Sequence, residues 1–463
     1  MIVSSSPPLQ RVHEILQRMQ TDTKNVECLK ICCGALAILA KDEANKLIIA
    51  RDGTRLILTV MEGHSTRPDL QASVCDLLWS LAFNNGLVKE VVGRQGGIAL
   101  ILKGMSYHLS SPELVKSACG ALSNMCQNTY NKNIIAAHGG VRTILSALHF
   151  HRMNGPLLPF VFDALASLVV GSQRNGLLVT DGGGIRSVLA TMCLHNTRRE
   201  VVKSGCHALA ILSDIQGQGK RIAGADGVKV LLPALRAHVR FVHLHRIAAI
   251  VLLRMLQEAA VARDIATHGG VVIILGMLRE HAREEETVAA TVHILYLITH
   301  ADVMCDGVEV EVGRHLSGIP PPSPVPERSG MRRVSTTLPS PRVVGSIPSG
   351  GREGGGDSGA ANVKGYGVEC SGIGDRELFN AGSVRALVMV LQVHMERKDI
   401  VRAAMRSLAN LIRLRSVVRA LLAEEGVLPT VLRCLAMHTI SRGITESAVS
   451  VAGSLLEAAY AGG

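Results

Sequence analysis

The sequence predicts an all-α protein built as a solenoid of about eight repeats, and two observations lead to this fold class. First, 47% of the 463 residues are apolar but only 3% are aromatic, with a single Trp, so the core must consist of Ala, Leu, Val and Ile. These side chains let helices pack closely, and the composition disfavours an all-β fold. Second, a glycine that opens a short apolar segment returns at a nearly constant interval. The repeats are therefore expected to form a single elongated domain, since stacked units share one continuous core.

The repeat is marked by anchor glycines, each usually preceded by Gly, Asp, Ala or Glu. They are Gly53, Gly97, Gly140, Gly184, Gly227, Gly270, Gly382 and Gly426. Successive spacings are 43 or 44 residues, except for one of 112 before Gly382, which corresponds to one repeat with an insertion. A period near 43 is typical of helical repeats of two or three helices and longer than the 33 or 34 residues of other helical repeats.

Each unit is expected to contain three helices, as residues 111–148 illustrate. Ser111 and Pro112 begin a long helix, the third of a unit, with Ser111 as the N-cap and Pro112 at the first position. The segment NKNIIAAHGG is a short first helix ended by glycines, which can adopt the left-handed conformation that a sharp reversal needs. VRTILSAL is the second helix, with apolar residues at helical spacing.

At this point the sequence resembles the armadillo repeat family. The resemblance lies in the helix-glycine-helix turn, the period, and third helices of the type Ala121-Leu122-Ser123-Asn124 and Ser407-Leu408-Ala409-Asn410. It covers residues 24–300 and 375–440. It implies a right-handed α-solenoid whose third helices line a concave surface, and a scaffold that holds extended peptides or partner proteins.

A histidine follows each anchor glycine by eleven or twelve residues and closes a [Met/Leu]-x-x-His tetrad. These ladder histidines are His64, His108, His151, His195, His238, His281, His394 and His438. The tetrad resembles that of armadillo repeat-containing protein six and its relatives, more than nuclear-import receptors. We expect each imidazole to cap the carbonyl groups at the end of its own helix.

A row of metal sites or pH sensors is the alternative for the ladder. We disfavour metal because successive histidines would lie too far apart to share one ion. One further cluster, His238, His243 and His245, has no nearby Cys or carboxylate to complete a site. We therefore expect no metal and no cofactor.

The predicted organisation is a disordered N-terminus (1–8), armadillo repeats (9–300), a disordered Pro/Ser/Gly-rich insert (301–374), and C-terminal repeats with a cap (375–461). In the insert, Arg332-Arg333-Val334-Ser335 resembles a basophilic kinase site and Ser340-Pro341 a proline-directed one. An unmodified tether is an equally good interpretation of both short patterns.

The formal net charge of +11 favours acidic partners, and the sequence assigns this charge to the repeats and not to the insert. Arg402, Arg406 and Asn410 are spaced four residues apart and share one helix face. Alignment with the armadillo third helix puts Arg406 and Asn410 where nuclear-import armadillo proteins use Trp and Asn. The same two positions hold Trp79 and Phe83, Gly120 and Asn124, Ala166 and Val170, and Ala210 and Asp214 in other units. The predicted partner-binding residues are therefore Trp79, Asn124, Arg402, Arg406 and Asn410, and an import receptor for basic signals is disfavoured because Arg406 would repel such cargo.

No catalytic motif is found, so we expect a protein that is not an enzyme. The eleven cysteines are scattered without a C-x-x-C, and no apolar run approaches the roughly eighteen residues of a membrane span. The predicted location is the cytoplasm, or the nucleus, and the predicted function is a protein-interaction scaffold that binds extended or acidic segments in its groove. A nucleic-acid-binding basic solenoid and a cytoskeletal or axonemal structural component remain open as alternatives.

Overall fold

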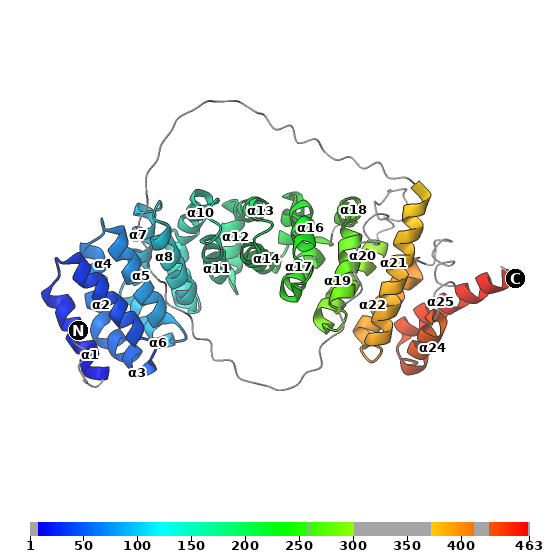
Figure 1. Ribbon diagram of the computed structural model, residues 1–463, viewed down its shortest axis with the longest axis horizontal. Coiled ribbons are helices and arrows are strands. Elements are labelled where there is room, and N and C mark those ends of the chain that lie inside the picture. The colour runs from blue at the N-terminus through cyan, green and yellow to red at the C-terminus, as the bar shows by residue number, and fades with distance from the viewer. Residues whose placement is uncertain (1–7, 258, 301–371, 412–425, 462–463) are drawn as a thin grey trace, which may run out of the picture.

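The structure, a computed structural model, describes residues 8–257, 259–300, 372–411 and 426–461. These residues form helices and contain no strand, and the helices stack into an elongated arc, so the predicted all-α solenoid of three-helix repeats is confirmed (Figure 1). The predicted insert up to residue 371 and residues 1–7 of the predicted disordered N-terminus lie outside the described residues.

The helices repeat in the predicted order. The first helices are α3 (Glu43–Ile48) with the π-helical turn η1 (Ile49–Gly53), α6 (Gly86–Arg94), α9 (Thr129–Ala137), α12 (Gln173–Asp181), α15 (Gln218–Gly224) and α18 (Ala259–Thr267). The second helices are α4 (Thr54–Gly63), α7 (Gly97–Tyr107), α10 (Gly140–Phe150), α13 (Gly184–Leu194), α16 (Gly227–Ala237), α19 (Gly270–Glu280), α21 (Gly372–Val393) and α24 (Val427–Met437). The third helices are α2 (Val26–Leu39), α5 (Pro68–Ala82), α8 (Pro112–Met125), α11 (Leu158–Val169), α14 (Arg199–Ser213), α17 (Val242–Met255), α20 (Glu285–His300), α22 (Lys398–Leu411) and α25 (Arg442–Ala461). Helix α1 (Pro8–Thr21) packs on α2 and α4 at the N-terminal end.

The two glycines between the first and second helices of a repeat have different structural roles: one adopts a left-handed backbone, and the other allows a close approach. Gly139 has φ +76, the left-handed conformation that the reversal requires. Gly140 is needed for close approach, because a Cβ there would lie 2.6 Å from the carbonyl oxygen of Ile135 in α9. In the turn before α16, Asp226 takes the left-handed place with φ 62 and Gly227 keeps the close approach. The two glycines thus determine the angle between α9 and α10.

One sequence prediction about local structure was confirmed and another was wrong. Ser111 is the N-cap of α8 and Pro112 opens the helix, as predicted, although the Ser111 side chain accepts no hydrogen bond from α8. Helix α21 runs unbroken through Gly382, so no reversal separates a first from a second helix there. Its start at Gly372 also places residues 372–374 in a helix, where the sequence predicted the end of the insert.

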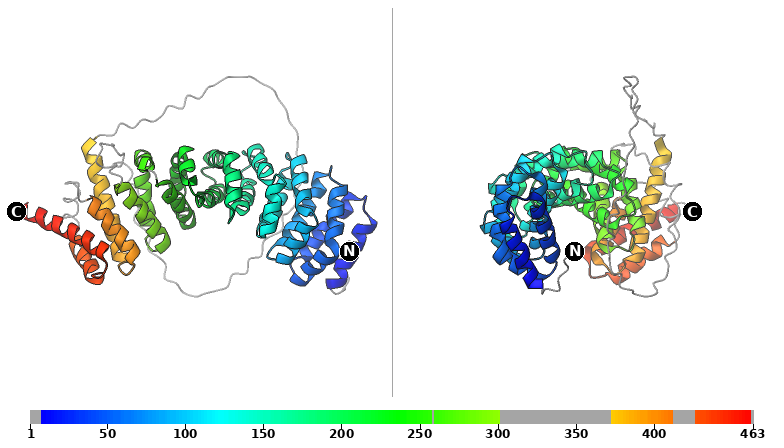
Figure 2. Two further views of the ribbon diagram at one scale, coloured as in Figure 1. Left: turned by 180° about the vertical axis from the view of Figure 1, so that it is seen from behind. Right: turned by 60° about the vertical axis from the view of Figure 1, so that its left-hand side comes forward.

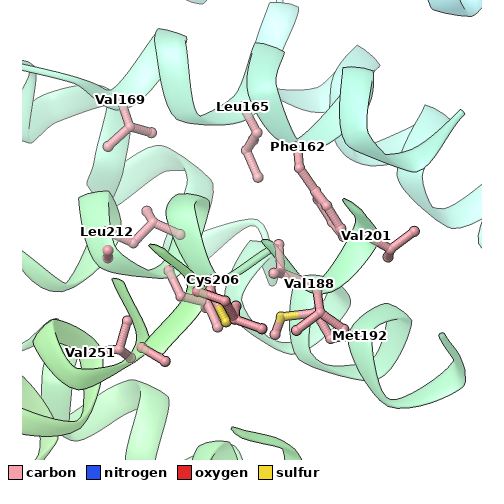
Figure 3. Packing of buried hydrophobic residues seen from close by; sticks show 14 of the residues in the cluster. Phe162, Leu165, Val169, Val188, Met192, Val201, Cys206, Leu212 and Val251 are labelled. Carbon is pink, nitrogen blue, oxygen red and sulfur yellow. The ribbon is translucent and has the colours of Figure 1, made fainter. Parts of the chain in front are cut away.

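The core is continuous from one repeat to the next. Between α11, α13 and α14, for example, Phe162 and Leu165 face Val188, Met192 and Cys206, and further apolar residues continue toward α17 (Figure 3). Fully burying such side chains contributes about 1.5–3 kcal/mol each relative to solvent exposure. A single three-helix unit cannot bury these faces by itself, so the stability of each repeat depends on its neighbours.

The ladder histidines join each repeat to the one before it. In all eight, Nε2 lies 2.6–3.0 Å from a backbone carbonyl oxygen of the preceding turn. His64 bonds Thr23, in the turn after α1. From His108 onward the acceptor is the residue that follows the preceding ladder histidine: Ser65, Leu109, Arg152, Asn196, Val239, Ala282 and Met395. Because a carbonyl only accepts, Nε2 carries the hydrogen in each case.

The prediction that these histidines cap their own helix therefore named the wrong acceptor. The carbonyl of each ladder histidine already receives the backbone N–H of the residue three positions later, as in the pair His195 and Arg198. The imidazole reaches past this closed turn to the neighbouring repeat, where it satisfies a backbone acceptor. Each such bond contributes about 0.5–1.5 kcal/mol net, and the row repeats it at every joint between units.

Among the described residues, no single helix is both long and apolar enough to cross a membrane. Two bent helix pairs, 173–181 with 184–194 and 260–267 with 270–280, meet the length and composition criteria together, and on those grounds only. The described part of the chain also holds no group of three or more His, Cys, Asp or Glu side chains placed to bind a metal ion.

Candidate functional site: the inner groove

The third helices line the inner face of the arc. In Figure 1 the second helices α10, α13 and α16 lie above the third helices α11, α14 and α17. The right-hand view of Figure 2, which is turned about the vertical axis, shows that the arc opens downward. The third helices therefore line the concave side of the arc, which we call the inner groove, and the second helices form the outer face.

The N-terminal part of the groove is aromatic. The indole of Trp79 (α5) lies over Gly120 (α8), where a Cβ would be only 2.4 Å from the ring. Its ring meets Phe160 (α11) edge-on, with centroids 5.7 Å apart and planes at 83°. Asn124 Nδ2 donates to the Trp79 carbonyl oxygen over 3.0 Å. Two predicted site residues, Trp79 and Asn124, thus lie together, and the amide donor of Asn124 already binds the neighbouring repeat.

A hollow of about 520 Å³ lies beside Trp79, between α2, α3 and α5. The exposed ring of Phe83 and the ammonium group of Lys46 line it. Lys46 Nζ donates to the Phe83 carbonyl oxygen (2.8 Å) and to the Glu43 carboxylate (2.6 Å), and this bond lowers the pKa of Glu43. The sequence analysis missed Lys46 and Glu43, because their pairing with a residue of the next repeat has no local signature.

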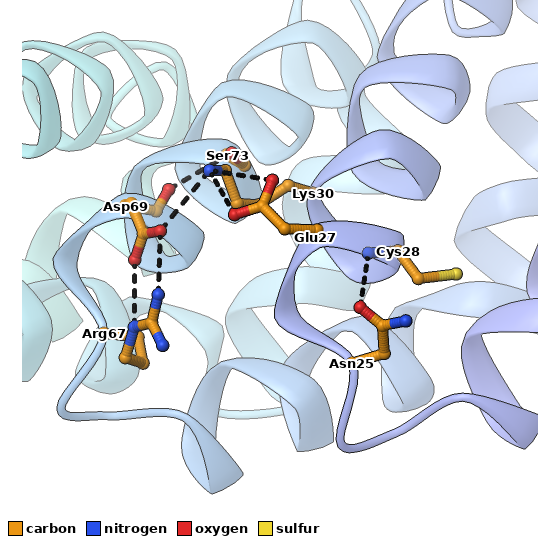
Figure 4. Close-up of polar contacts among 7 residues, drawn as sticks. All are labelled: Asn25, Glu27, Cys28, Lys30, Arg67, Asp69 and Ser73. Carbon is orange, nitrogen blue, oxygen red and sulfur yellow. Dashed lines mark hydrogen bonds and ion pairs between the residues drawn. The ribbon is translucent and has the colours of Figure 1, made fainter.

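The outer end of α5 carries charges that are neutralised within the chain. Lys30 of α2 bridges Glu27 of its own helix (3.2 Å) and Asp69 of α5 (3.4 Å), and Arg67 binds the same Asp69 (Figure 4). These contacts lower the pKa of Asp69, mainly through the Arg67 hydrogen bond. This stretch offers a partner no free basic group.

The middle of the groove is also internally paired. Arg254 of α17 bonds Asp214 of α14 (3.2 Å), and Arg246 of α17 bonds Glu286 of α20 (2.6 Å). Two carboxyls nearer the N-terminal end, Asp76 and Asp163, belong to exposed residues, although partial desolvation raises their pKa. A negative ligand is therefore disfavoured at this end of the groove.

The C-terminal part of the groove keeps unpaired cations. Arg402 and Arg406 are exposed on α22, and neither forms an ion pair with a described residue. The Arg406 guanidinium lies 6.0 Å from the ring centroid of Tyr296 on α20, and its tip also approaches Gly443 of α25. Asn410 Nδ2 lies 3.3 Å from Thr299 Oγ1. The five predicted site residues therefore form two clusters toward opposite ends of the groove, separated by α11, α14, α17 and α20.

The predicted alignment of Trp79 with Gly120 and Arg406 was wrong by three residues. The common position, twelve residues after each ladder histidine, is occupied by Asp76, Gly120, Asp163, His207, Ile250, His293, Arg406 and Ser450. Trp79 lies one turn further along α5, and this offset is what allows its ring to cover Gly120 of the next helix. The groove position therefore changes from acidic at the N-terminal end to basic at α22.

The expectation of a basic groove is likewise corrected. The third helices carry ten Lys or Arg and eleven Asp or Glu. The second helices α4, α7, α10, α13, α16, α19 and α24 carry eight Lys or Arg and only two Glu. Between these two sets of described helices, the excess of positive charge thus lies on the second helices and not on those that line the groove.

The fold, the repeat and the groove define an α-solenoid of armadillo-type repeats. Residues 101–301 match the family model described as the GAC ARM domain. No curated protein matches the chain. The match to this model does not test the resemblance to armadillo repeat-containing protein six, which stays a prediction.

Solved structures are similar to this chain at low sequence identity. An engineered protein is 21% identical with TM-score 0.47, covering 53% of this chain and 96% of its own. A structure from work on a phosphorylation switch in the cadherin–β-catenin interaction is 14% identical with TM-score 0.49, covering 96% and 80%. The UNC-45 chaperone, described as binding and folding muscle myosin, is 12% identical with TM-score 0.50, covering 98% of this chain and 44% of its own. At these identities the likeness concerns the fold alone, and this chain spans less than half of the chaperone's length.

Proposed function

We propose that the protein is a non-catalytic scaffold that holds an extended segment of a partner protein in its inner groove, in the cytoplasm or nucleus. The observation that carries this proposal is the pair of exposed arginines on α22, Arg402 and Arg406, which have no acidic partner among the described residues. A guanidinium group binds carboxylates in a bidentate manner, so these two side chains suit an acidic stretch.

The polarity of the groove specifies how such a segment would lie. Its acidic stretch would contact Arg402 and Arg406, with Asn410 beside them. Its other end, at Trp79 and Asn124, would carry apolar or basic residues, because Asp76 and Asp163 repel carboxylates there. A nucleic acid, with its uniform negative charge, fits this polarity poorly. The proposed ligand is therefore a segment of mixed charge, and no cofactor is involved.

The test is a charge reversal on α22. Arg402→Glu with Arg406→Glu should weaken binding of the captured partner about 30-fold, roughly 2 kcal/mol, as the loss of central interface arginines does. Partners are identified by affinity capture and mass spectrometry, and the affinity of the purified partner is then measured by titration. The matched control is Arg142→Glu with Arg186→Glu on the outer face, which changes the charge equally and should leave the affinity unchanged. Full retention of every partner by the folded groove variant would refute the proposal.

A further inference from the structure

Three successive turns at one edge of the solenoid carry an exposed surface that the groove does not use. They join α10 to α11, α13 to α14, and α16 to α17, and we call their exposed residues the turn patch. Its apolar members are Phe150, Met153, Leu194, Val239 and Phe241, and its basic members are Arg152, Arg198, Arg199 and Arg240. The only acidic residue in the three turns is Glu200, which is paired with Arg199.

The turns form one continuous surface because side chains tie them together. His195 Nε2 bonds the carbonyl of Arg152 (2.8 Å), and His238 Nε2 bonds the carbonyl of Asn196 (2.9 Å). Arg198 crosses to the preceding turn, where its side chain lies against Gly155. The Arg199 guanidinium lies 4.5 Å from the ring centroid of Phe241 in the following turn. The patch is thus fixed in shape before any partner arrives, which lowers the entropic cost of binding.

The composition of the patch is that of an interface core. Arginine, Met and aromatic residues are enriched at the centres of protein interfaces, and contiguous exposed apolar groups mark interaction sites. Arg152, Arg198 and Arg240 form no ion pair with any described residue, so their charge is available to a ligand. We propose that the turn patch binds a short protein segment in which carboxylate and apolar side chains alternate, independently of the inner groove.

The shape of the patch favours a peptide over the other polyanions. Val239 and Phe241 are only 38% exposed, and Phe150 and Leu194 are about half exposed, so only Met153, at 70%, protrudes. A bilayer rewards side chains that protrude into it, whereas a peptide can follow a surface of low relief. Single-stranded nucleic acid stacks successive bases on several open aromatic faces, whereas Phe150 is the one uncovered ring of the patch, since Arg199 covers one face of Phe241 and the aliphatic members offer no stacking.

The experiment is a selection of random 16-residue peptides displayed on phage against the full chain. Peptides are counter-selected on the variant Arg152→Glu/Arg198→Glu/Arg240→Glu, then synthesised with a fluorophore and titrated by polarisation. We expect enrichment of sequences with both carboxylates and apolar residues, and at least a tenfold loss of affinity in this variant. A second variant, Phe150→Ser/Leu194→Ser, should weaken the same peptides while keeping the charge.

Two controls separate this surface from the others. The charge-matched variant Arg55→Glu/Lys103→Glu/Arg433→Glu, on exposed positions of α4, α7 and α24, and the groove variant Arg402→Glu/Arg406→Glu should both bind the peptides as the wild type does. The proposal is overturned if no acidic–apolar peptides are enriched, or if their affinity survives the patch reversal. It is also overturned if the patch reversal abolishes binding to phosphatidylserine vesicles or to poly(U) RNA and leaves peptide binding intact.

Discussion

We call the contact of each ladder histidine with the preceding repeat a joint. The joints of His195 and His281 differ by one buried side chain in the third helix beside them. At the joint of His195, the residue seven positions later in α14 is Val202, which is fully buried, and the corresponding residue is aliphatic in several other repeats. In α17 that position is His245, also fully buried. Its Nε2 faces the Leu235 carbonyl oxygen at 3.3 Å, and its Nδ1 accepts from His281 Nε2 over 2.9 Å. His281 therefore shares its hydrogen between His245 and the Val239 carbonyl, which is the usual ladder acceptor.

This comparison shows how a uniform repeat acquires one sensitive joint. Burial lowers the pKa of His245 to about 4, with further contributions from His281 and His238. Burial lowers the pKa of His281 as well, although the Val239 carbonyl and the nearby Glu280 and Glu284 oppose this. Protonation of His245 would put a hydrogen on Nδ1 and break the bond from His281. The joint at His195 contains no such second imidazole.

The largest expected effect is a loss of stability in acid at this joint alone. Because the folded pKa of His245 lies below its ordinary value of 6.5, the unfolded chain binds the proton more tightly. The stabilising contribution is present above pH 6.5 and is lost as the pH falls toward about 4, at a cost of about 3 kcal/mol. Hydrogen exchange measured by mass spectrometry should show α17 and α19 losing protection between these values before α13 and α14. Simultaneous loss across all repeats would contradict a localised joint.

Removing a ladder imidazole at an ordinary joint should have the next largest effect. His195→Ala leaves the Arg152 carbonyl without its donor and creates a gap between two turns. We expect a loss of about 2 kcal/mol in the free energy of unfolding, measured by chemical denaturation. The matched control is His138→Ala, since His138 is exposed and bonds only the carbonyl of Ile134 in its own helix. If His138→Ala lowers the free energy of unfolding as much as His195→Ala does, the bond from His195 to the preceding repeat has no special stabilising role.

Converting the unusual joint into an ordinary one should cost little at neutral pH. His245→Val introduces the aliphatic type of residue that five other repeats have at this position, and the His281 hydrogen then bonds the Val239 carbonyl alone. We expect less than about 1 kcal/mol change at pH 7, in either direction, because replacing a buried polar pair by packing is often neutral. The acid-induced loss should largely disappear, as seen by repeating the exchange experiment at pH 5. Persistence of that loss in the variant would assign it to another group.

The smallest effect is expected at Asp226, in the turn before α16, which belongs to the same repeat as His245. Asp226 holds a left-handed backbone where five other turns use glycine before the second helix: Gly96, Gly139, Gly183, Gly269 and Gly426. Asp226→Gly should increase the free energy of unfolding by about 0.5–1 kcal/mol, because glycine adopts this conformation without strain. The measurement is a small rise in melting temperature. The gain is reduced by the loss of the exposed pair with Lys229, and Lys229→Ala measures that share separately. A destabilised Asp226→Gly variant would show that the backbone strain is negligible.

The sequence was sufficient to predict the repeat, because the anchor glycines and the ladder histidines recur at nearly fixed spacing. It could not identify the histidine acceptors, since these lie one repeat away and depend on how closely the turns stack. Trp79 was misaligned because the Ala-Leu pattern of the third helices still fits when the alignment is shifted by one helical turn. Counting twelve residues from His64 would have placed Asp76 at the common position. The distribution of charge between second and third helices could have been counted from the sequence. The pairing of His245 with His281 could not, because it joins helices of different repeats.

The ladder also has a direction, which matters while the chain is being synthesised. Each histidine reaches back to a carbonyl of a segment made earlier, so its acceptor is already in place when it emerges. Successive repeats can therefore dock in order, from α1 onward, each about 43 residues after the last. His394 is the exception, because its acceptor, Ala282, precedes it by 112 residues. The C-terminal repeats thus join the growing solenoid after a delay more than twice as long as at any other joint.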